Sequence, residues 1–170
     1  MKKHIALTIL LLVSVICSAQ TRSALKFNVQ AGESVCFTST GYYTGYETVQ
    51  SFVHAQLEWN HLIAGVGYDF PNDGTGTGDA SLRLGYTLST SDGRFGGDAS
   101  AVFQRGIGHQ EGNTTLAGAG VTFYLRIAGP LYVLGEARTL YPFFNNGYYR
   151  YSYYRPGMVS YLSLGLAVKF

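Results

Sequence analysis

The sequence predicts an all-β fold, an eight-stranded antiparallel up-and-down barrel, from three observations. Apolar residues alternate with small or polar residues over nearly the whole chain, which is the period of two that a strand shows. The connections between the alternating segments are alternately short and long. The last segment, residues 162–170, is itself a strand, and its backbone groups need partners. Pairing of the last strand with the first supplies them and closes the sheet without an edge.

Eight segments carry the alternation, and each has about the length that crosses a bilayer as a tilted strand. In the last one, Leu162, Leu164, Leu166, Val168 and Phe170 share one face, and small residues with Lys169 share the other. The apolar markers of the other seven fall in residues 25–31, 49–59, 62–70, 80–88, 95–103, 117–127 and 131–137.

The connections predict which end of the barrel is which. Short turns are expected at residues 60–61, 89–93 and 128–130, and longer connections at 38–46, 71–78, 106–114 and 142–157. An even number of strands places both chain ends on the side of the short turns. Outer-membrane barrels have this asymmetry, with short turns toward the periplasm and longer loops toward the outside.

The N-terminus predicts a signal peptide at residues 1–19 and a barrel domain at 20–170. Lys2 and Lys3 form a charged start, residues 5–16 form a short apolar stretch, and Ala19 precedes the expected cleavage site. The apolar stretch is too short to span a bilayer as a helix. Loss of the two lysines leaves ten basic and ten acidic residues, so no broad basic surface of the kind that nucleic acid requires is expected.

The face opposite the apolar one distinguishes a membrane barrel from a secreted soluble barrel such as a lipocalin. A soluble barrel turns its apolar face inward and covers the outer face with charge. Here the second face carries mostly Gly, Ser and Thr with a few charges, and charged residues make up 13% of the chain. Small residues and sparse charges suit a narrow lumen, so the sequence favours a transmembrane β-barrel.

The terminal segment ending in Phe170 resembles the C-terminal assembly signal of bacterial outer-membrane barrels, and the chain resembles the small eight-stranded barrels of the OmpA/OmpX type. The resemblance implies the outer membrane of a Gram-negative bacterium as the location. It also implies outer-membrane lipid and lipopolysaccharide as surroundings, and recognition of Leu162, Leu164, Leu166, Val168 and Phe170 by the barrel-assembly machinery.

Six charged residues are expected to point into the lumen: Glu58, Arg83, Asp98, Arg126, Glu136 and Arg138. Both signs are present, and an eight-stranded interior is just wide enough for side chains to fill. We expect a network of ion pairs that closes the lumen as a structural plug. The alternative is a gate, in which exchange of partners would open a narrow, porin-like pore.

The fourth long connection is rich in tyrosine and arginine, the residue types that dominate contact surfaces. Its candidate recognition residues are Tyr148, Tyr149, Arg150, Tyr151, Tyr153, Tyr154 and Arg155. They predict a surface that binds a partner protein, lipopolysaccharide or a glycan. The alternative is the aromatic girdle that anchors a barrel at the membrane interface.

No cofactor, metal site or catalytic group is predicted. A barrel enzyme that modifies lipid A needs a histidine beside a serine or carboxylate near the outer rim; His54 is expected too deep, and His109 with Glu111 is expected to be a solvated loop pair. We therefore expect a structural or adhesive outer-membrane barrel. The alternatives are the narrow pore, the lipid A enzyme and a component of a secretion or conjugation machine.

Overall fold

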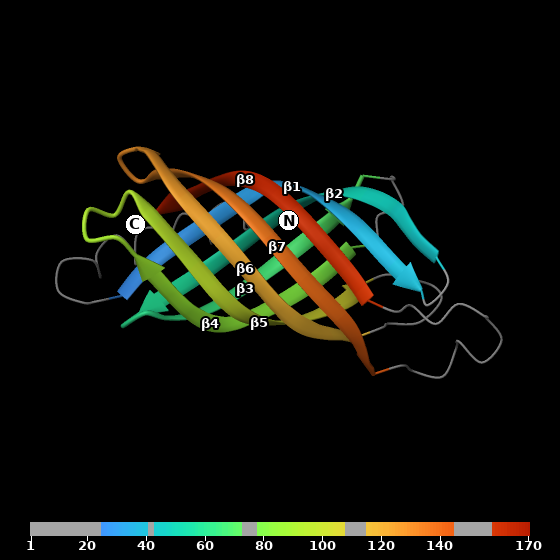
Figure 1. The fold of residues 1–170 in the computed structure, drawn as a ribbon. Helices are drawn as coiled ribbons and strands as arrows, with labels where there is room; N and C mark the ends of the chain where they lie inside the picture. Colours follow the sequence, from blue (N-terminus) through green and yellow to red (C-terminus); the bar gives the residue numbers. More distant parts are fainter. Residues whose placement is uncertain (1–24, 41–42, 73–77, 108–114, 145–157) are drawn as a thin grey trace, which may run out of the picture.

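The computed structural model describes residues 25–40, 43–72, 78–107, 115–144 and 158–170. These residues form eight antiparallel strands that follow one another around a closed barrel (Figure 1). The strands are β1 (Leu25–Thr40), β2 (Tyr43–Trp59), β3 (Leu62–Pro71), β4 (Gly78–Ser89), β5 (Phe95–Ile107), β6 (Thr115–Ala128), β7 (Leu131–Phe144) and β8 (Met158–Lys169). The predicted fold is therefore confirmed, while the predicted signal peptide at 1–19 lies outside the described residues.

The first and last strands close the barrel, as the terminal alternation predicts. Their pairing runs from Asn28 with Lys169 to Ser39 with Met158. Beyond it, the amide of Phe170 donates to the carbonyl oxygen of Phe27 at 2.8 Å, and the amide of Phe27 donates back at 3.1 Å. Phe170 is thus part of the seam, and the last strand has a hydrogen-bonded neighbour on both sides.

The strands are staggered, so each strand is tilted relative to the barrel axis. Paired residues followed once around the barrel from Asn28 return to β1 at Thr38, through Gln56, Gly65, Arg83, Val102, Gly118, Leu140 and Val159. Such a stagger is what closing a twisted sheet requires. It also brings side chains from distant strands to one level of the lumen.

The connections between strands agree with the predicted alternation at three turns and differ at one long connection. Asn60 and His61 have positive φ values of 48° and 68°, the geometry of a two-residue hairpin turn. However, the connection predicted at residues 38–46 is mostly strand, since β1 continues to Thr40 and β2 begins at Tyr43. Threonine and tyrosine have high strand propensity, and here this outweighs the glycines that suggested a loop.

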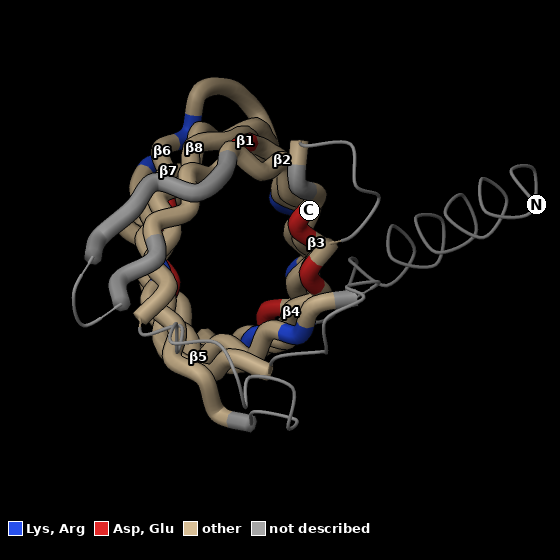
Figure 2. Tube along the Cα trace, turned by 90° about the vertical axis from the view of Figure 1, so that its right-hand side faces the viewer, with Lys and Arg blue, Asp and Glu red and all other residues tan. Residues whose placement is uncertain are grey.

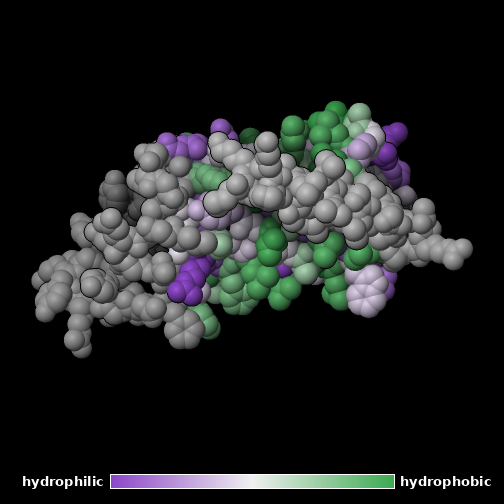
Figure 3. Space-filling view, turned by 180° about the vertical axis from the view of Figure 1, so that it is seen from behind, coloured by the Kyte–Doolittle hydropathy of each residue, from purple (hydrophilic) through white to green (hydrophobic). Residues whose placement is uncertain are grey.

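The outer face is apolar and the inner face is polar. Large hydrophobic side chains point outward and are exposed, with Leu164 73%, Phe123 67% and Leu88 64% accessible. Hydrophobic residues occupy much of the visible middle of the wall, and hydrophilic ones lie toward its ends (Figure 3). Among the described residues, no helix is long and apolar enough to span a membrane. The distribution of apolar and polar side chains is the opposite of a lipocalin-type barrel.

Glycines permit close approach of the strands at the seam. Gly32 and Gly165 face each other across β1 and β8. A Cβ atom on Gly165 would collide with the carbonyl oxygen of Ala31 and lie 3.0 Å from the Cα atom of Gly32. The lack of both side chains therefore lets the two backbones come close where the barrel closes.

Candidate functional site

The lumen contains a cluster of buried charged side chains, which we call the lumen cluster. It consists of His54 of β2, Asp69 of β3, Arg83 of β4, and Glu136 and Arg138 of β7. Looking along the barrel axis, charged positions lie on the wall near β3 and β4 within the ring of strands (Figure 2). Because β3 and β4 lie across the ring from β7, contacts among these residues span the lumen.

Arg83 and Glu136 form the most direct bridge across the lumen. Arg83 Nη1 donates to Glu136 Oε2 at 2.6 Å, and Nη2 donates to Oε1 at 2.9 Å. Two parallel bonds of this kind match the fork of the guanidinium to the two carboxylate oxygens. Both side chains are at most 1% exposed, so each ion depends on the other for the interactions that water would otherwise provide.

Arg138 forms a second bridge and links the two carboxylates. Its Nη2 donates to Asp69 Oδ2 at 2.7 Å, and its Nε lies 3.8 Å from Glu136 Oε1. The second contact is too long for a hydrogen bond but retains the charge attraction. The guanidinium also lies over the ring of Tyr161, with its carbon 4.1 Å from the ring centroid. The charges of the two arginines, Asp69 and Glu136 cancel.

His54 completes the cluster between a carboxylate and a guanidinium. Its Nε2 is 3.3 Å from Asp69 Oδ1 and 3.4 Å from Arg83 Nη2. When Nε2 carries a proton it donates to Asp69, and when it does not it accepts from Arg83. Gly67 makes room for this ring, because a Cβ atom there would collide with the imidazole. The ring of Phe52 stacks on the imidazole, with 4.6 Å between the ring centroids.

A second polar network lies in the lumen around the hydroxyl of Tyr124. This hydroxyl donates to Asp98 Oδ2 and accepts from Gln30 Nε2 at 2.7 Å. Gln56 Oε1 accepts from Asn28 Nδ2 at 2.9 Å. Lys169 Nζ lies 3.4 Å from the centroid of the Tyr124 ring, so the end of β8 packs into this network.

The structure places the six charged residues predicted to face the lumen in different surroundings. It brings Arg83, Glu136 and Arg138 together in the lumen cluster. Asp98 is buried in the lumen but is bonded to Tyr124. Glu58 is 15% exposed and pairs at 2.7 Å with Lys26, which is 55% exposed.

Arg126 does not join the lumen cluster in this structure. Arg126 is exposed, and its Nε donates to the carbonyl oxygen of Gly129 at 2.7 Å. The pairing of β6 with β7 shifts between Arg126 and Ala128, where the chain turns at the end of the barrel. Arg126 itself still pairs in register with Tyr132, so its exposure follows from its place at the end of the strand.

Sequence reasoning missed two members of the lumen cluster. Alternation places Asp69 on the same face as Gly67, and His54 on the face opposite Val53, so both are expected to point inward. The sequence does not show which charged residue either side chain contacts, because Asp69 meets Arg138 only through the stagger of the closed barrel. Position on the inner face is the available signal, and it identifies these residues without showing what they contact.

The remaining predicted residues lie on the barrel wall or beyond the described chain. Leu162, Leu164 and Leu166 are exposed on the outer face of β8, with Val168 partly exposed on the same face, and Phe170 is exposed directly after the strand. Cys36 is buried in an inward apolar cluster with Val102, Leu140, Val159 and Tyr161. The tyrosine and arginine residues at 148–155, together with His109 and Glu111, lie outside the described residues. Within the described ranges, no group of three or more His, Cys, Asp or Glu could hold a metal ion.

A closed barrel of eight strands with an apolar outer wall and a charged interior is a transmembrane β-barrel. Comparison with solved structures supports this fold. The barrel is similar to Neisserial surface protein A (NspA), with a TM-score of 0.55, 20% sequence identity, and coverage of 85% of this chain and 97% of that chain. It is also similar to a major outer membrane protein from Thermus thermophilus, with a TM-score of 0.55, 16% identity, and coverage of 86% and 100%.

The sequence comparisons add no family. No sequence-family profile matches the chain, and no curated protein matches it. The closer resemblance to the OmpA/OmpX type therefore stays a prediction.

We expect the Arg83–Glu136 bridge to be a coupled unit of stability. Arg83→Gln or Glu136→Gln should each lower the free energy of unfolding by about 3–5 kcal/mol, because each leaves a buried charge without its main partner. The double variant should lose clearly less than the sum of the two single losses. Urea unfolding of the refolded barrel in lipid vesicles measures these values.

The matched control is the Lys26–Glu58 pair at the barrel end. Because Lys26 is largely exposed, Lys26→Gln or Glu58→Gln should change the free energy of unfolding by about 0–1 kcal/mol. If the double variant of Arg83 and Glu136 lost as much free energy of unfolding as the two single variants together, the coupled bridge would be contradicted.

Proposed function

We propose that the protein is an integral outer-membrane β-barrel of a Gram-negative bacterium that serves as a non-conducting structural body and carries a recognition surface on its outer loops. The observation that supports this best is the lumen cluster, whose ion pairs join β3 and β4 to β7 across the interior. A lumen bridged by buried, mutually neutralised side chains suits an anchor better than a channel. We assign no catalytic role.

The proposed location follows from the wall and the strand ends. An exposed apolar wall requires lipid around it, and strands with small inward residues are the pattern of outer-membrane barrels. We place the short-turn end in the periplasm and the longer connections outside. Residues 1–19 are proposed as a signal peptide that is removed after export, with Leu162, Leu164, Leu166, Val168 and Phe170 as the assembly signal.

Location is tested by fractionation of a Gram-negative host that expresses the full chain. The protein should appear in the outer-membrane fraction, begin at Gln20 by mass spectrometry, and migrate differently on gels before and after boiling, as a closed barrel resists detergent until heated. Recovery as a soluble periplasmic protein would contradict the proposal.

The plug and the gate make opposite predictions for ion flow. In planar bilayers we expect the wild-type barrel to show no stable conductance, because the charged groups of the lumen are held by one another. Glu136→Gln should remain non-conducting or flicker briefly as Arg83 loses its partner. A stable wild-type conductance that changes with Glu136→Gln would instead show that the lumen cluster is a gate.

The recognition surface is proposed for Tyr148, Tyr149, Arg150, Tyr151, Tyr153, Tyr154 and Arg155, on the basis of their composition. Tyrosine and arginine offer large contact areas with hydrogen-bonding ends. Replacement of Tyr149, Tyr151 and Tyr153 by Ser should reduce binding of the host cells to partner protein or glycan surfaces, while the gel shift of the folded barrel remains. Undiminished binding would remove these residues from the proposed surface.

A further inference from the structure

The lipid-facing wall is hollowed along β5. Between Phe95 and Phe103, the outward positions of this strand are occupied by Gly97, Ala99 and Ala101. Large side chains flank them on the neighbouring strands. Leu88 of β4 and Phe123 of β6 both pair with Gly97, and Tyr86 and Val121 both pair with Ala99.

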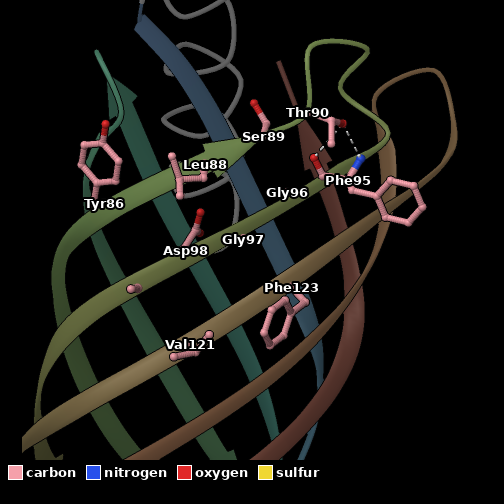
Figure 4. Close-up of a pocket in the computed structure, with 11 residues that line it drawn as sticks. Tyr86, Leu88, Ser89, Thr90, Phe95, Gly96, Gly97, Asp98, Val121 and Phe123 are labelled. Carbon is pink, nitrogen blue, oxygen red and sulfur yellow. Dashed lines mark hydrogen bonds between the residues drawn. The ribbon is translucent and has the colours of Figure 1, made fainter.

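The result is an apolar groove with a volume of about 510 Å³. Figure 4 shows Gly96 and Gly97 between Leu88 on one side and Phe123 on the other, with Phe95 near the hairpin turn. The groove is open to the surroundings of the barrel rather than to the lumen. Its shape and chemistry suit one acyl chain lying along the wall.

A second pocket, lined by both charged and apolar side chains, adjoins the groove at the rim of the barrel, and Phe95 lines both. This rim pocket is formed between the β4–β5 and β6–β7 turns by Arg94, Arg126 and Asp92, together with Leu125, Ile127 and Gly129. The amide of Arg126 donates to the carbonyl oxygen of Arg94 at 2.8 Å, so the two arginines are neighbours across the strands. Both are exposed.

The rim pocket carries a net positive charge. Asp92 Oδ2 is 3.5 Å from Arg94 Nε. Hydrogen bonds from the hydroxyl of Thr90 and the amide of Arg94 hold the pKa of Asp92 below its ordinary value, so this carboxylate is ionised at neutral pH. Two guanidinium groups against one carboxylate leave one positive charge, which matches one phosphodiester.

We propose that the groove and the rim pocket together form a binding site for an anionic phospholipid. The phosphate binds between Arg94 and Arg126, and one acyl chain lies over Gly97 and Ala99. Guanidinium groups bind phosphate oxygens through paired hydrogen bonds, and basic side chains at the membrane border favour anionic headgroups. The site rests on the proposed function for its placement in the periplasmic leaflet.

The site is local, and it is compatible with the balanced charge of the chain. Ten basic and ten acidic residues remain after residue 19, so the barrel has no broad basic surface that would attract anionic lipid. Two arginines placed beside an acyl-sized groove provide selectivity without such a surface.

Lipid retention in native mass spectrometry tests the proposal on the purified, detergent-solubilised barrel. With phosphatidylglycerol and phosphatidylcholine offered in equal amounts, the wild type should retain phosphatidylglycerol in preference. The double variant Arg94→Gln, Arg126→Gln should lower this preference about tenfold. Gly97→Leu and Ala99→Leu should reduce retention of both lipids, because each fills the groove. Asp92→Asn should increase the preference for phosphatidylglycerol by removing the competing carboxylate.

Matched controls are available on the same wall. Arg105→Gln removes an exposed arginine near the opposite end of β5, and Ala64→Leu enlarges an outward side chain on β3 away from the groove. Both should retain lipid as the wild type does. Each variant is compared only if its folded band shifts on boiling, and Ala99→Leu tests the groove even if Gly97→Leu does not fold.

Three outcomes would overturn the proposal. One is equal retention of both lipids by the wild type. Another is unchanged retention in the groove variants, and the third is displacement of phosphatidylglycerol by equimolar glycerol phosphate, which would reveal a plain phosphate site. Since the measurement uses purified barrel, a negative result leaves the fractionation and conductance results standing. Loss of the outer-membrane location would likewise leave measured lipid selectivity intact.

Discussion

Closure of the sheet between β1 and β8 is the constraint on which the rest of the structure depends. A wall surrounded by hydrocarbon cannot leave backbone amides and carbonyls without partners, and the pairing from Asn28–Lys169 to Ser39–Met158 removes the two edges. The stagger of this closed ring then decides which inward side chains share a level. Arg83 and Glu136 meet because of it, although they belong to strands on opposite sides of the lumen.

The interior shows how a narrow barrel accommodates charge by pairing it. Arg138 bonds to Asp69 and approaches Glu136, while Arg83 binds Glu136 with two hydrogen bonds. Ion pairs of this kind contribute little net stability compared with a well-packed apolar core, yet each partner is costly to leave alone. In a barrel whose outer wall must be apolar, the lumen is the place left for such groups.

Most of the fold could be predicted from the sequence because strand alternation is a local property. The inward direction of Arg83, Glu136 and Arg138 follows from strand alternation alone. Their partners do not, since the meeting of Arg138 with Asp69 depends on the register of every strand in the ring. Alternation does not show where the barrel ends, so it could not predict that Arg126 is exposed at the rim. Strand propensity outweighs a glycine-rich composition at Thr40 and Tyr43. The groove over Gly97 was equally hidden, because it is created by the neighbours of a small residue rather than by that residue.

The reciprocal hydrogen bonds between Phe27 and Phe170 have a consequence for the lifetime of the folded protein. An open sheet can unravel from its border, one strand at a time, at modest cost for each step. In the ring no strand is an edge strand. The first strand to leave must therefore break its hydrogen bonds to both neighbours before any chain entropy is gained. A closed ring therefore favours slow unfolding, and the persistence of such a barrel depends on that rate as well as on its equilibrium stability.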